Sequence, residues 1–133
     1  MTASGDTIAK PRPRPAASHS HDSSLQVRMR LVRGDDIAIG PGKAELLELI
    51  SVTGSIAAAG REMGMSYKRA WLLVETMNHA FREPLVVASR GGTDKGGASL
   101  TSTGLAVLAA YRRLLAKIEV SPDLAEIRSK ARR

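Results

Sequence analysis

The chain lacks several residues on which other classes of protein depend. It has 133 residues and no cysteine, which excludes disulfides, thiolate metal sites and cysteine nucleophiles. Two of its three histidines, His19 and His21, lie close together near the N-terminus, so a structural zinc site is not expected. One Trp, one Phe and two Tyr leave the core to aliphatic and methionine side chains.

Long hydrophobic runs are also missing. No stretch approaches the roughly 18 apolar residues that a membrane span needs, and the first residues lack the apolar centre of a signal peptide. We therefore expect a cytoplasmic protein. The length suits one domain with a single core. No acid–base pair and no nucleophile with a neighbouring base stands out, so an enzyme is not expected.

Positive charge is what the chain has in excess, with a formal net charge of +7. Residues 25–120 contain thirteen basic and nine acidic side chains, so the expected folded part is itself basic. Such a balance favours polyanionic partners, nucleic acid first and an acidic membrane surface second.

The first third of the chain changes character twice. Residues 1–24 are rich in Pro, Ser and His and have too little apolar surface to fold, so they are expected to form a disordered tail. Apolar and polar residues alternate from Leu25 to Arg33, which predicts a half-buried strand. Gly34 ends this strand, and Asp36–Ile39 provides a short second piece.

Three helices are predicted next. Pro41 suits the first helical position of a helix that runs to about Thr53. Ser55 caps a short second helix, whose small residues permit close packing and which Gly64 closes. Ser66 caps a longer third helix with one apolar stripe, formed by Ala70, Leu73, Val74, Met77 and Phe81.

A β-hairpin and two further helices complete the predicted order. Residues 85–89 and 98–100 are separated by a glycine-rich tip, the pattern of a hairpin. Thr101 or Ser102 caps a fourth helix with a wide apolar face, and Ser121-Pro122 begins a basic-ended helical extension, residues 121–133. The predicted fold class is mainly α with a small β-hairpin, a winged helix-turn-helix over residues 25–120.

The start of the third helix carries the chemistry for nucleic acid binding. Ser66, Tyr67, Lys68 and Arg69 lie at the positive end of the helix dipole, which favours phosphates and the acceptor atoms of guanine. Helical winding places Lys68, Leu72, Glu75 and His79 opposite the apolar stripe, where Leu72 can meet a thymine methyl group. The plain alternative is a solvated basic face. For Trp71 we expect a role in helix packing.

The hairpin and the second helix provide the remaining candidate DNA contacts. The glycine-rich tip lets the backbone approach phosphates while Arg90 and Lys95 supply charge, and Ser55 begins the second helix. The tip is not a nucleotide-binding P-loop, because it lacks the Gly-Lys-Ser/Thr order and joins two strands. A loose solvated loop is the alternative reading.

Several of these segments together resemble a known family. They are Gly54-Ser55-Ile56, the stretch Gly64 to Trp71, Met77-Asn78, the glycines and Lys95 of the hairpin tip, and Leu100-Thr101 with Gly104. Taken together, they resemble the N-terminal domain of the molybdate-dependent transcriptional regulator ModE family. LysR-type regulators share the Gly-Ser-Ile start and the Leu-Thr-x-x-Gly ending but lack the start of the third helix and this wing. The resemblance covers roughly residues 25–120.

The resemblance implies a dimeric winged-helix DNA-binding protein that regulates transcription. Ser66 to Arg69 would then read the operator and the wing would lie on the DNA backbone. ModE regulators hold molybdate in C-terminal domains, for which this sequence shows no equivalent. We therefore expect no cofactor in this chain and no molybdate binding, since no second concave site is anticipated beside the DNA-binding surface.

The sequence thus predicts a sequence-specific, homodimeric transcription regulator that binds double-stranded DNA and no membrane. Two alternatives remain open: an architectural DNA-binding protein with little sequence preference, and a winged helix that has become a protein-interaction module. The operator sequence, the direction of regulation and the controlling signal do not follow from the sequence.

Overall fold

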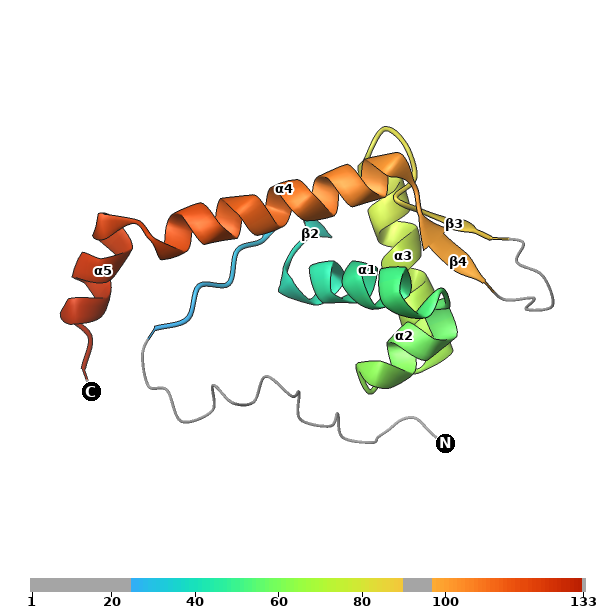
Figure 1. The fold of residues 1–133 in the computed structure, drawn as a ribbon, viewed down its shortest axis with the longest axis horizontal. Coiled ribbons are helices and arrows are strands. Elements are labelled where there is room, and N and C mark those ends of the chain that lie inside the picture. Colours follow the sequence, from blue (N-terminus) through green and yellow to red (C-terminus); the bar gives the residue numbers. More distant parts are fainter. Residues whose placement is uncertain (1–24, 90–96, 133) are drawn as a thin grey trace.

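The structure is a computed structural model that describes residues 25–89 and 97–132 (Figure 1). The predicted tail, residues 1–24, lies outside the described residues. Nine elements occur in the described part, in the order β1 (Leu31–Arg33), β2 (Asp36–Ile39), α1 (Pro41–Thr53), α2 (Ile56–Glu62), α3 (Tyr67–Ala80), β3 (Val86–Ala88), β4 (Ala98–Leu100), α4 (Ser102–Glu119) and α5 (Pro122–Ser129). This mainly helical, winged-helix-like fold with a small β3–β4 hairpin confirms the predicted fold class.

The N-terminal strand is shorter than the sequence predicts. Strand β1 begins only at Leu31 and pairs antiparallel with β2 across a turn at Gly34, whose φ is +61°. The pairing shifts register between Leu31 and Val32, and both side chains are exposed, at 45% and 60%. The prediction of a half-buried strand from residue 25 is therefore wrong, because a strand needs a partner and β2 offers only four residues.

The core is aliphatic, as the composition predicts, and α1 lies at its centre. Helix α1 contacts α2, α3, α4 and β4, and Leu46, Leu47 and Ile50 on its inner face have no exposed surface. The apolar stripe of α3 closes the core from the other side through Ala70, Val74 and Met77.

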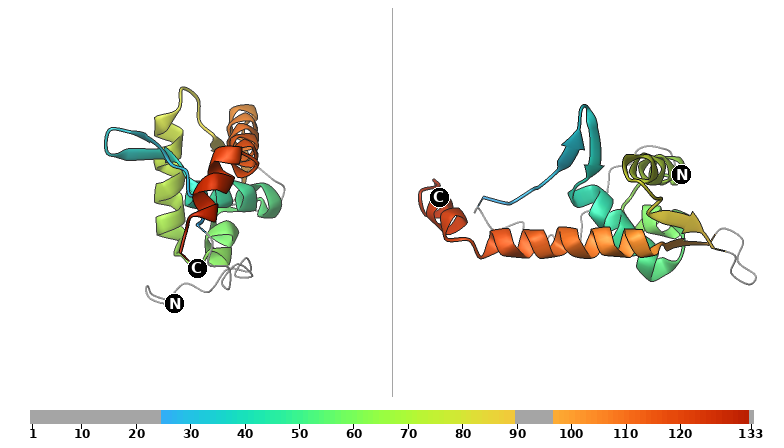
Figure 2. Two further views of the ribbon diagram at one scale, coloured as in Figure 1. Left: turned by 90° about the vertical axis from the view of Figure 1, so that its left-hand side faces the viewer. Right: turned by 90° about the horizontal axis from the view of Figure 1, so that it is seen from above.

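Helix α4 belongs only partly to this core. Figure 1 and the right view of Figure 2 show it running from the hairpin past the body of the domain to α5. Leu108 and Tyr111 are buried, and the Tyr111 hydroxyl donates to the Met29 carbonyl at 2.8 Å. Leu105 and Leu114 remain 53% and 42% exposed. Within the described residues, no helix is both long and apolar enough to span a bilayer.

Candidate nucleic-acid interface

Helices α2 and α3 are joined by a tight turn in a helix-turn-helix arrangement, and residues close to the turn in the sequence fix their ends. The Ser55 hydroxyl caps α2 by accepting the Ala58 N–H at 3.0 Å. Gly64 then reverses the chain with a φ of +73°, a conformation that favours glycine. The two helices approach closely, because a Cβ added at Gly60 would lie 3.0 Å from Ala70 Cβ. The predicted small-residue packing and the predicted caps are confirmed.

The first turn of α3 presents cations that are free to bind a ligand. Ser66 caps it by accepting the Arg69 N–H at 3.1 Å, and the turn contains no acidic residue. Lys68 and Arg69 are exposed, and neither side chain forms a hydrogen bond or ion pair with any residue that the structure describes. Tyr67 and Trp71 are 56% and 42% exposed, so Trp71 is less enclosed than a packing role suggests. Positive charge and open aromatic faces therefore meet at the positive end of the helix dipole.

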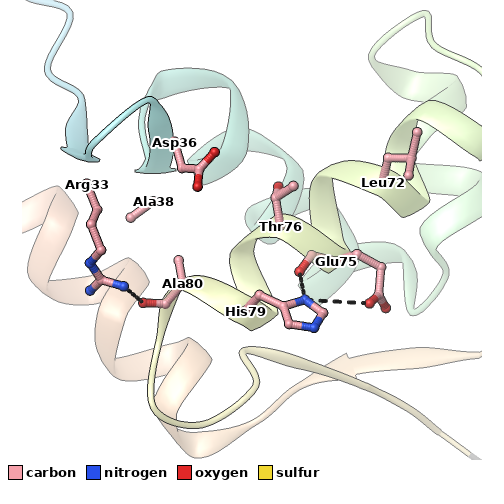
Figure 3. A pocket seen from close by; sticks show the side chains of 8 residues that line it. All are labelled: Arg33, Asp36, Ala38, Leu72, Glu75, Thr76, His79 and Ala80. Atoms are coloured by element: carbon pink, nitrogen blue, oxygen red, sulfur yellow. Dashed lines mark hydrogen bonds and ion pairs between the residues drawn. The ribbon is translucent and has the colours of Figure 1, made fainter.

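The C-terminal half of α3 lies beside the β1–β2 hairpin, a neighbour that the sequence did not predict. Leu72 is 47% exposed, and with Glu75 and His79 it lines a cleft of about 330 Å³ between α3 and the β1–β2 hairpin. Figure 3 shows the Arg33 side chain, from β1, directed toward Ala80, whose carbonyl accepts its hydrogen bond at 3.1 Å. The sequence missed this cleft because nothing local places the hairpin beside α3. The outward direction predicted for this face is confirmed for Lys68, Leu72 and His79, which are exposed, and Glu75 is partly buried.

The wing is anchored at the start of α2. Ala98 donates its N–H to the Gly54 carbonyl at 2.9 Å, and Gly97 forms an isolated bridge with Ser55. The base of the β3–β4 hairpin therefore lies beside the helix-turn-helix. Arg90 and Lys95, the predicted contacts of the wing tip, lie outside the described residues.

Asn78, which the sequence offered only within the Met77-Asn78 segment of the resemblance, is a positioning residue. Its amide nitrogen donates to the Val86 carbonyl at 3.0 Å, and its amide oxygen accepts the N–H groups of Leu85 and Val86 at 2.8 and 3.1 Å. One side chain on α3 thus fixes the first residues of the wing. An asparagine inside a helical pattern is the only local signal, because this residue type is a poor interior helix former.

A second concave site corrects another expectation. A cavity of about 330 Å³ lies between the N-terminal segment, the start of α1 and α3, and its charged lining residues are Arg28, Arg30, Lys43 and Arg69. The expectation that the domain has no second concave site is therefore wrong. Among the described residues, no group of three or more His, Asp or Glu side chains is placed to hold a metal ion.

Three curated proteins illustrate what the chain is similar to. The molybdenum-pterin-binding proteins MopB and MopA of Rhodobacter capsulatus are 45% and 40% identical to it in alignments of 93 and 90 residues. These alignments cover 65% and 68% of this chain and 34% of each relative. The DNA-binding transcriptional dual regulator ModE of Escherichia coli K12 is 38% identical over 79 residues, 59% of this chain and 30% of that protein.

These matches cover only part of each relative. No protein-family model matches the chain, and the chain spans about a third of the length of the curated relatives it matches. None of these three names describes an enzyme. Over about two thirds of its own length, the chain is related in sequence to the ModE and Mop proteins.

Proposed function

We propose that this protein is a sequence-specific DNA-binding regulator of transcription. The observation that carries the proposal is the first turn of α3, where Lys68 and Arg69 are exposed and unpaired among the described residues, next to the Ser66 cap. A helix of this kind can enter the major groove with its N-terminal residues on the base edges. The guanidinium or ammonium group can then bind guanine O6 and N7.

The other candidate contacts flank this helix. Ser55 caps α2 beside the base of the wing, and its hydroxyl, which accepts the Ala58 N–H, still has a proton to donate to a backbone phosphate. Arg90 and Lys95 of the wing tip are proposed to bind phosphates on the same account. The net charge of +7 supports binding to a polyanion, and the name of the Escherichia coli relative supports regulation of transcription.

A homodimer is the proposed assembly, because the chain leaves apolar side chains uncovered on elements that leave the core. Leu105 and Leu114 of α4, Val120 after it and Ile127 of α5 are 53%, 42%, 80% and 56% exposed. A two-fold dimer would cover such a face and present two α3 helices about 34 Å apart, one turn of DNA.

Selection of bound fragments from genomic DNA, followed by titration against competitor DNA, tests the proposed function. We expect a shared motif with two half-sites and an affinity for it at least about a thousandfold above that for random duplex. Binding without sequence preference would instead indicate an architectural protein. Absence of DNA binding at low salt would indicate a protein-interaction module.

A further inference from the structure

The basic cavity beside α1 differs in charge from the cleft of Figure 3 and from the groove near the end of α3. Four cationic side chains line it, Arg28, Arg30, Lys43 and Arg69, and no acidic residue does. The cleft of Figure 3 contains Asp36 and Glu75 in its lining, and the groove near the end of α3 contains Glu83. An anion would therefore meet net attraction here.

The four cations come from three separate parts of the chain. Arg28 and Arg30 precede β1, Lys43 belongs to the first turn of α1, and Arg69 to the first turn of α3. The aliphatic stem of Arg30 lies against the start of α1, since a Cβ added at Gly40 would lie 3.1 Å from Arg30 Cγ. Among the residues that the structure describes, the guanidinium groups of Arg28, Arg30 and Arg69 have no hydrogen-bond or ion-pair partner.

Apolar side chains form the rest of the lining and strengthen the field of these cations. Ile37, Met63, Met65 and Leu73 are partly buried lining residues, and a low-dielectric wall focuses the potential of nearby charges. Lys43 reflects this environment. Burial lowers its pKa, an effect that the Asp36 carboxylate opposes, so an added anion would favour its charged form. Its ammonium already donates to the Ile37 carbonyl.

Backbone donors add to the cations at this point. The cap residue of α1, Gly40, has no side-chain cap, and the first intrahelical hydrogen bond is the one from Ala44 N–H to the Gly40 carbonyl, at 2.9 Å. Gly42 and Lys43, whose N–H groups come before this bond and have no partner within the helix, are lining residues of the cavity.

We infer that this cavity is a phosphate site that receives a DNA backbone phosphodiester next to the groove in which α3 lies. The inference rests on the proposed function. Arg69 and Leu73 connect the cavity with α3, so a phosphate held there would fix the register of that helix on the duplex without reading sequence. A free oxyanion has the same chemistry and is the other source that the experiment distinguishes.

Gly42 offers a variant that changes charge in the cavity without disturbing the fold. A Cβ at Gly42 would meet no atom within 4 Å, and an aspartate in the first turn of a helix is favoured by the helix dipole. Because Gly42 is a lining residue, Gly42→Asp adds a negative charge at the wall of the cavity. Gly42→Asn is the matched control, because it has the same shape without the charge.

The full-length chain is titrated with duplex DNA over a range of salt concentrations. We expect Gly42→Asp to bind at least about tenfold more weakly than Gly42→Asn, and its salt slope to be smaller by about 0.9, the value for one lost phosphate contact. The double variant Arg28→Gln, Arg30→Gln should also weaken DNA binding, whereas Arg113→Gln on α4 should leave it unchanged. Equal DNA affinities and slopes for the two Gly42 variants would overturn the assignment to the DNA backbone.

A second arm uses inorganic phosphate without DNA and keeps the proposal separable from the proposed function. Amide resonances of Gly42 and Lys43 should shift saturably with millimolar phosphate in the parent protein and in Gly42→Asn, and not in Gly42→Asp. Such shifts, together with equal DNA affinities, would assign the cavity to a free oxyanion and refute the DNA contact. If the parent protein binds no DNA, the proposed function fails while these shifts still decide the site. Absence of any shift, with equal DNA affinities, would refute the phosphate site altogether.

Discussion

Lys68 is the residue on which sequence recognition is expected to depend most. Its ammonium is exposed on the first turn of α3 and unpaired among the described residues. We expect Lys68→Ala to weaken specific binding by about 1–3 kcal/mol more than non-specific binding, because a lost base contact is felt only at the correct sequence. Titration of operator and random duplexes at one fixed salt concentration measures the difference.

Charge-matched variants separate this effect from the loss of a positive charge. Lys117→Ala removes an equally exposed cation from α4 and should leave the specificity ratio unchanged. Arg90→Ala and Lys95→Ala should weaken specific and non-specific binding alike, as expected for phosphate contacts. A specificity ratio of Lys68→Ala equal to that of the parent protein would remove Lys68 from the recognition site.

At the scale of elements, Asn78 links α3 to the start of the β3–β4 hairpin. Its amide makes three hydrogen bonds with the backbone of Leu85 and Val86. Asn78→Ala would leave these backbone groups short of partners, so we expect a loss of about 1–3 kcal/mol in the free energy of unfolding. Urea denaturation measures the loss.

DNA binding by the same variant tests whether Asn78 acts by holding the hairpin in place. With the first residues of the wing released, the DNA affinity of still-folded Asn78→Ala should fall about equally for all sequences. Thr76→Ala is the control on the same helix, since its hydroxyl donates, among the described residues, only to the Leu73 carbonyl of its own helix, at 2.9 Å. A denaturation midpoint for Asn78→Ala equal to that of the control would argue against the link.

Elements whose ends are set by neighbouring residues could be predicted from the sequence. Four helices begin where the sequence predicts, at Pro41 or after the caps Ser55, Ser66 and Thr101. Helix caps can be predicted because they depend on groups only two or three residues away. The strand from residue 25 failed because pairing depends on a distant partner. The amide links of Asn78 and the cavity of Arg28 and Arg69 likewise need the folded arrangement of separate elements.

At the scale of the whole molecule, the uncovered face of α4 predicts association. Sedimentation at micromolar concentration should show a dimer in the parent protein, because the exposed apolar side chains of α4 gain most from burial against a second copy. Leu114→Glu should give a monomer whose operator affinity falls at least about a hundredfold, since one of two half-sites is lost.

Val52→Glu is the control for the added carboxylate, because Val52 is an apolar residue with 73% exposure that belongs to α1 and not to the uncovered side chains of α4 and α5. It should stay dimeric and bind the operator normally. A parent protein that remains monomeric at micromolar concentration even with operator DNA would count against the dimer, as would a Leu114→Glu variant that still sediments as a dimer.

Molybdate is a ligand to test, because two relatives are named as molybdenum-pterin-binding proteins. Tight capture of a tetrahedral oxyanion needs several donors that converge in a preformed pocket. In the basic cavity the arginines Arg28, Arg30 and Arg69 are exposed, so ordering their side chains and displacing water would offset much of the attraction. We therefore expect no saturable heat when the purified protein is titrated calorimetrically with molybdate or tungstate up to about a hundred micromolar, and only phosphate-like competition at millimolar concentration. Operator affinity should be the same with and without micromolar molybdate. A micromolar dissociation constant that Gly42→Asp abolishes would falsify this expectation and make the cavity an effector site.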